Sequence, residues 1–88
     1  MVFAILSEML RRGTTELIGW LGVIAILAAY VSLNFGFVSP KSLVYLLLNS
    51  VGSLCIIVDA LRQKDYQPVV LNIVWAAVAV MSIIKISL

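Results

Sequence analysis

The chain has 88 residues, of which 64% are hydrophobic and only 11% are charged, whereas an ordinary soluble domain is about 45–50% apolar and about 25% charged. It has no histidine and one cysteine, so zinc sites, haem ligation by histidine and histidine-assisted nucleophilic catalysis lack their residues, and we expect neither an enzyme nor a cofactor. Six basic and four acidic residues give a net charge of +2, and their scatter along the chain argues against the clustered basic surface that binds nucleic acid. The composition predicts an all-α protein of the lipid bilayer.

Charged residues divide the sequence into three apolar runs. These runs contain 24, 17 and 19 uncharged residues and begin after Glu16, Lys41 and Asp65, close to the ~20 residues that cross a hydrocarbon core of ~30 Å. We therefore expect three transmembrane helices in a single domain, 14–88, with the helices over about 15–35, 40–62 and 68–86. Both connections are short, so neighbouring helices should be antiparallel.

The ends of these helices carry recognisable signals. Thr14 or Thr15 is placed to cap the first helix, and Gly36 is placed to end it. Ser39 and Pro40 fit the N-cap and the first residue of the second helix, because a proline at the first helical position loses no hydrogen bond. The other proline of the chain fits the first turn of the third helix.

The first residues of the chain form a separate segment, 1–13. Its apolar run covers only residues 2–6 and is followed by Arg11 and Arg12, so it is too short to span a membrane. A signal peptide has its positive charges before the apolar run and a cleavage site after it, the reverse of this order. We expect an interfacial amphipathic segment, with a disordered tail as the alternative.

The distribution of basic residues predicts the orientation. Three spans place Arg11, Arg12, Arg62 and Lys64 on the side of the N-terminus, and two lysines on the other side. The positive-inside rule then puts the N-terminus in the cytoplasm, and we expect the membrane to be a bacterial inner membrane.

Asn49 lies within the second apolar run. An unsatisfied amide in hydrocarbon costs several kcal/mol, so this side chain should face another helix, another subunit or a wet cavity. Tyr45, Gly52 and Ser53 lie at i−4, i+3 and i+4 and give the helix one polar face of small residues. Asn49 and Ser53 are candidate solute contacts, and an interhelical hydrogen bond by Asn49 is the alternative.

Asn72 and Trp75 are the corresponding candidates in the third helix. Ala76 and Ala79 continue the predicted stripe at i+4 and i+7 from Asn72. An amide supplies a donor and an acceptor, and an indole supplies a flat apolar face with one N–H, a combination that suits a polar solute with apolar faces. Packing or interfacial anchoring of the tryptophan is the alternative.

Two further patterns concern structure. Small residues along the first helix, among them Gly19 and Gly22, would let another backbone approach closely. Asp59 and Arg62 are three residues apart near the end of the second helix and are expected to form an ion pair.

The segments LIGW at 17–20 and DYQPVVLN at 65–72 resemble the SWEET-like superfamily, and within it the semiSWEETs, over about residues 15–87. The resemblance implies a three-helix half-transporter that forms a parallel homodimer around a central solute pathway, and it implies that Asn72 contacts sugar. The family's first helix has a Pro-Gln hinge where this chain has YVSL at 30–33. The family's tryptophan in the second helix is absent too, and Trp75 is the candidate replacement.

Two functional hypotheses follow. In the first, an oligomer, expected to be a homodimer, binds or moves a small polar solute between subunits; Asn72 and Asn49 hydrogen-bond the solute and Trp75 packs against it. In the second, the protein is an accessory or scaffold subunit of a membrane complex, and the same asparagines join helices. A channel-forming oligomer is a weaker third hypothesis, because a water-filled pore needs polar residues along a whole helical stripe. The expected partners are membrane lipid, a second copy and a small solute.

Overall fold

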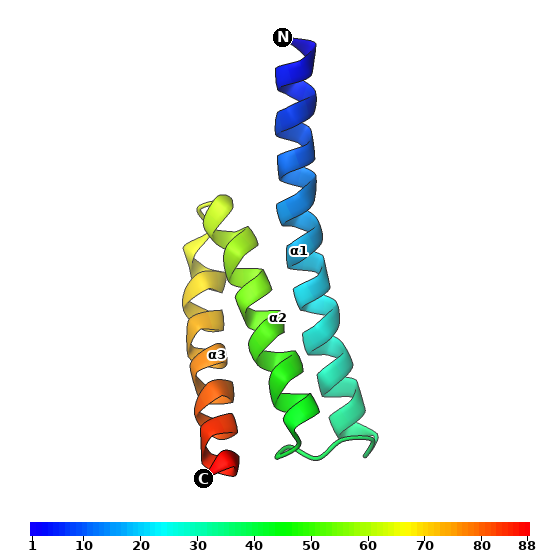
Figure 1. Ribbon diagram of the computed structural model, residues 1–88, viewed down its shortest axis with the longest axis vertical. Coiled ribbons are helices and arrows are strands. Elements are labelled where there is room, and N and C mark those ends of the chain that lie inside the picture. Colours follow the sequence, from blue (N-terminus) through cyan, green and yellow to red (C-terminus); the bar gives the residue numbers. More distant parts are fainter.

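The computed structural model describes residues 1–2 and 13–88 and contains three helices, α1 (Val2–Asn34), α2 (Leu43–Arg62) and α3 (Tyr66–Ser87) (Figure 1). The stretch Gly13–Asn34 of α1 and the whole of α2 and α3 are each long and apolar enough to cross a membrane. No strand occurs in the described part of the chain. The predicted all-α architecture of three spans is confirmed, and the protein is a small integral membrane protein. The predicted interfacial segment, 1–13, falls largely outside the described residues.

The turn after α1 ends the helix where the sequence predicted. Gly36 has a φ of 80°, a left-handed conformation that glycine adopts without steric cost. The N–H of Phe37 donates to the carbonyl of Ser32 at 2.8 Å, and the N–H of Gly36 donates to that of Leu33 at 3.2 Å. These two bonds satisfy carbonyls that the helix end would leave unpaired inside an apolar environment.

Two predicted helix starts are wrong. The N-cap of α2 is Ser42, whose Oγ accepts the N–H of Tyr45 at 3.2 Å. The Oγ of Ser39 instead accepts the N–H of Lys41 at 3.2 Å, within the turn that precedes α2. Of the two serines in this segment, the one directly before the first residue of α2 is therefore the N-cap. Thr14 and Thr15 do not start α1, because Gly13 and both threonines are already helical.

The central helix is α2, and α1 and α3 both pack against it, antiparallel to it (Figure 1). Among the described residues, α1 and α3 share no Cα–Cα approach within 8 Å. Gly52 of α2 faces α1, whereas Asn49 bonds to α3. Three residues correspond to about 300° of helical rotation, so these two directions differ by only about 60°. The outer helices therefore dock on neighbouring sides of α2 and leave an open face between them.

Small residues make the contacts between helices. A Cβ added at Gly22 would lie 2.5 Å from the carbonyl oxygen of Gly52, and one added at Gly52 would lie 2.9 Å from the carbonyl oxygen of Gly22. The two backbones thus touch directly where α1 crosses α2. Elsewhere the buried side chains are mostly small or polar ones, such as Ala29, Ser53, Ala60, Ala76 and Ala79.

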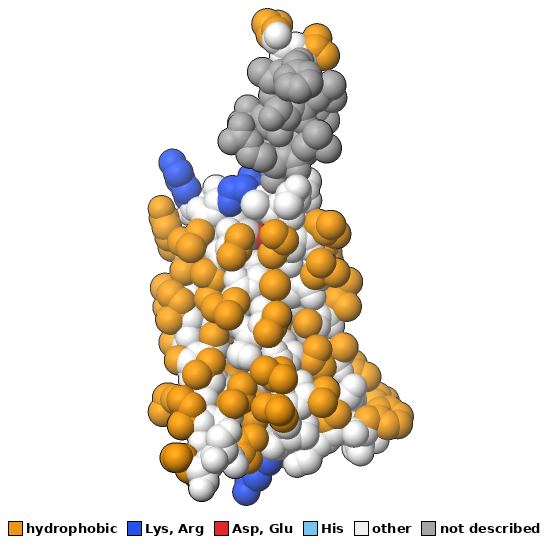
Figure 2. All heavy atoms as spheres, viewed as in Figure 1, with side chains coloured by type: hydrophobic (Ala, Val, Ile, Leu, Met, Phe, Trp, Pro, Cys, Tyr) orange, Lys and Arg blue, Asp and Glu red, His pale blue; other side chains and the backbone are white. Residues whose placement is uncertain are grey.

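Large apolar side chains cover the outside. On α2 they form a stripe that is 45–55% exposed, with the helical spacing of one face, at Leu47, Val51, Leu54, Val58 and Leu61. Figure 2 shows hydrophobic side chains over the length of the bundle, with lysine and arginine side chains gathered at its two ends. A soluble protein buries such residues, whereas here they are placed to contact acyl chains.

The Gly22 contact gives the first prediction. Gly22→Ala should lower the free energy of unfolding by about 1–3 kcal/mol, because the new methyl group would overlap the backbone of α2. The measurement is reversible unfolding in mixed micelles. Gly13→Ala is the matched control, because a Cβ at Gly13 meets nothing within 4 Å; equal destabilisation by both substitutions would contradict the packing argument.

Candidate functional site

Asn49 is held between α2 and α3. Its side chain is only 5% exposed, which confirms that the amide faces protein. Its Nδ2 donates to the carbonyl oxygen of Tyr45 at 2.8 Å, and its Oδ1 accepts the indole Nε1–H of Trp75 at 2.9 Å. The chain therefore supplies partners for both polar atoms of this amide and leaves its second N–H available.

Trp75 forms part of the wall of a cavity of about 370 Å³ between α2 and α3. The indole is 48% exposed, so the hydrogen bond fixes the ring while leaving much of it accessible. The other residues of the wall include Tyr45, Asn49 and Ser82, together with Val74 and Val78. An aromatic face, an apolar floor and a few polar groups together suit a small solute with mixed polarity.

Asn72 does not line this cavity. It is 7% exposed, and its Nδ2 donates to the carbonyl oxygen of Pro68 at 2.8 Å. The buried residues of α3 recur at helical spacing and include Asn72, so its side chain faces α2. Trp75 follows Asn72 by three residues and lies about 60° from it around the helix, and it lines the cavity that Asn72 does not reach.

Ser53 also lies outside the cavity walls. Its side chain has no exposed surface, and its Oγ has no hydrogen-bond partner among the described residues. The structure thus brings together two of the four predicted site residues, Asn49 and Trp75, and places Asn72 and Ser53 inside the packed core.

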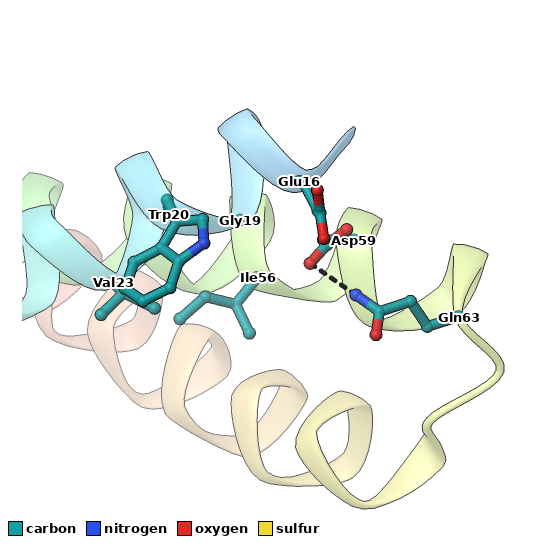
Figure 3. A pocket seen from close by; sticks show the side chains of 7 residues that line it. All are labelled: Glu16, Gly19, Trp20, Val23, Ile56, Asp59 and Gln63. Carbon is teal, nitrogen blue, oxygen red and sulfur yellow. Dashed lines mark hydrogen bonds between the residues drawn. The ribbon is translucent and has the colours of Figure 1, made fainter. Parts of the chain in front are cut away.

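A second cavity, of about 250 Å³, lies between α1 and α2 near the opposite end of the spans (Figure 3). Asp59 packs against Gly19, where a Cβ would come within 2.6 Å of its Oδ2. That Oδ2 accepts a hydrogen bond from Gln63 Nε2 at 2.8 Å. Arg62 lies 3.7 Å from Oδ1, which confirms the predicted ion pair at a separation too long for a hydrogen bond. In Figure 3 the side chain of Glu16 points toward Asp59.

The polar partners of the Asp59 carboxylate, Arg62 and Gln63, come from α2 itself, and Asp59 meets α1 at the backbone of Gly19. In the part of the chain that the structure describes, no three Asp, Glu, Cys or His residues gather as metal ligands would.

Both cavities open on the same side of α2. Their walls share one face of this helix, because Asn49, Ile56 and Gln63 recur at intervals of seven residues. The cavity at Gln63 is completed by α1, and the cavity at Asn49 is completed by α3. The open face between the outer helices therefore carries Asn49 and Gln63, whereas Asn72 and Ser53 lie in the packed core.

Sequence reasoning missed Ser82, although it follows Trp75 by seven residues and so shares its face of α3. Tyr45, which the sequence placed on the face of Asn49, lines the same cavity.

The indole hydrogen bond gives the second prediction. Trp75→Phe keeps an aromatic ring but removes the donor to Asn49, so the free energy of unfolding should fall by about 0.6–2 kcal/mol. The measurement is again unfolding in mixed micelles. Trp20→Phe is the control, because Trp20 is exposed on α1 and its indole makes no hydrogen bond to another helix among the described residues. If Trp75→Phe leaves the free energy of unfolding unchanged, the hydrogen bond adds nothing to stability.

Residues 15–88 match the model of a protein family, a match that covers all three spans. No curated protein matches the chain. No solved structure matches it either.

Proposed function

Because the chain belongs to the family whose model matches residues 15–88, we propose a function for the whole three-helix unit. The protein is a half-transporter of SWEET-like architecture. Two copies pair in parallel in the bacterial inner membrane, with their N-termini in the cytoplasm, and bind or move a small polar solute.

The cavity at Asn49 and Trp75 carries this proposal. It lies within the apolar spans, where an arrangement of amide, indole and phenol side chains is costly to expose to lipid. Asn49 keeps one N–H free, Trp75 presents an accessible ring, and Tyr45 adds an aromatic ring with a hydroxyl group. These groups can bind the hydroxyl groups and the apolar face of a sugar-like solute.

A second copy would complete the site. The cavity is open on one side, and no further helix of the described residues covers it. Related by a two-fold axis along the membrane normal, the open faces of two copies would cover each other and enclose the polar groups. Such a shared space would lie between subunits.

The scaffold hypothesis is favoured by a different observation. The bond from Trp75 satisfies Asn49 without any solute, and Asn72 is bonded to its own helix. In that alternative the same residues only hold α3 against α2, and the open face binds another protein of a complex.

Uptake by proteoliposomes separates the two functions. With a panel of sugars and other small polar metabolites, we expect at least one compound to enter, and Asn49→Ala should reduce its uptake roughly ten-fold, the equivalent of about 1.4 kcal/mol. Asn34→Ala is the control, since that amide bonds to its own helix and lies in neither cavity.

Asn72→Ala tests the role that the resemblance implies: reduced uptake supports it, and unchanged uptake limits the site to the cavity. No uptake of any compound, together with lowered stability alone, would favour the scaffold.

Cross-linking tests the paired face. In a Cys55→Ala background, Val78→Cys at the cavity should give a covalent dimer with a short bifunctional thiol reagent in membranes. Val58→Cys should give much less, because Val58 is exposed on the opposite face of α2 from Asn49. Equal dimer yields would contradict the proposed orientation.

A further inference from the structure

A third pocket, of about 320 Å³, lies at the end of the bundle formed by the α1–α2 turn and the last turns of α3. Two lysines from different elements reach it. Lys41 precedes α2, and Lys85 is in the last turn of α3, while Ser82 supplies a hydroxyl group between them and the cavity at Asn49. The sequence alone explains Lys85 by snorkelling to the interface, but it does not explain why both lysines share one pocket.

The charges around this pocket are unbalanced. The described acidic side chains are Glu16 and Asp59, which line the cavity at the opposite end of the spans, and Asp65, which is the N-cap of α3 at that end. Two ammonium groups on one pocket repel each other, and an anion between them removes that cost. The N-terminus of α2 adds partial positive charge at this end and the C-terminus of α3 adds partial negative charge, so the two helix dipoles largely offset each other. The two lysines therefore set the charge of the pocket and favour an anionic occupant.

The remaining walls are apolar. Pro40, Leu46 and Ile86 line the pocket, and the two lysines mark the level where the apolar spans end. An occupant of this pocket thus has an anionic group at the membrane surface and apolar groups directly beneath it. That combination describes a phospholipid better than a free anion.

We propose that this pocket binds an anionic phospholipid, with its phosphate between Lys41 and Lys85 and its upper acyl carbons against Leu46 and Ile86. The site is separate from the proposed solute function and does not depend on it. It shares Pro40, Leu46 and Ser82 with the cavity at Asn49. A bound lipid therefore lies at the mouth of that cavity.

Lipid retention measured by native mass spectrometry tests the site. The protein is released from nanodiscs that contain phosphatidylglycerol and phosphatidylcholine in equal amounts, and the bound lipid is identified. We expect wild-type protein to retain phosphatidylglycerol preferentially, and Lys41→Gln and Lys85→Gln each to lower that preference about five-fold. Lys64→Gln is the matched control, an exposed lysine in the turn at the other end, and it should leave the preference unchanged.

Thermal unfolding in detergent provides the second measurement and separates lipid from free phosphate. Added phosphatidylglycerol should raise the unfolding temperature of the wild type more than phosphatidylcholine does, and the Lys41→Gln/Lys85→Gln double variant should lose this difference while unfolding normally without lipid. An equal rise with inorganic phosphate at the same concentration would overturn the lipid assignment. Equal retention of the two lipids, or an equal loss in Lys64→Gln, would overturn the site.

Discussion

The hydrogen bond from Trp75 to Asn49 is the interaction on which the arrangement of α2 and α3 depends. It joins side chains 26 positions apart at 2.9 Å within the apolar spans, where hydrocarbon offers neither partner a substitute hydrogen bond. An apolar helix can slide or rotate on another at little cost, whereas a bonded amide and indole fix one register. The same bond holds the indole at the cavity wall, so structural stability and a candidate binding surface come from one contact.

Close backbone contact holds α1 against α2. Between membrane helices, burying leucine gains little because lipid is equally apolar, so contact depends on dispersion at short distance and on polar bonds. Gly22 and Gly52 allow that short distance, and the Gly19 backbone leaves room for Asp59 one turn from the end of the span. The inside of the protein is accordingly small and polar, and the outside is large and apolar.

The sequence was sufficient to predict what depends on local pattern. The lengths of the apolar runs predicted the three spans, and Gly36 predicted the end of α1. The free-energy cost of an amide without hydrogen bonds in hydrocarbon predicted that Asn49 and Asn72 are buried. It could not predict which helix each amide faces, because that depends on the rotation of α3 against α2. Asn72 is packed in the core, whereas Trp75, three residues later, lines the cavity. Ser42 replaced Ser39 as the N-cap for a similar reason, because two serines competed locally and only the path of the turn decides between them.

In the described parts of the chain α1 and α3 each contact α2 but do not contact each other. The bond between Asn49 and Trp75 joins α3 to α2, and close contacts at Gly19 and Gly22 join α1 to α2. A shift of one outer helix along α2 would therefore not have to break the contacts of the other.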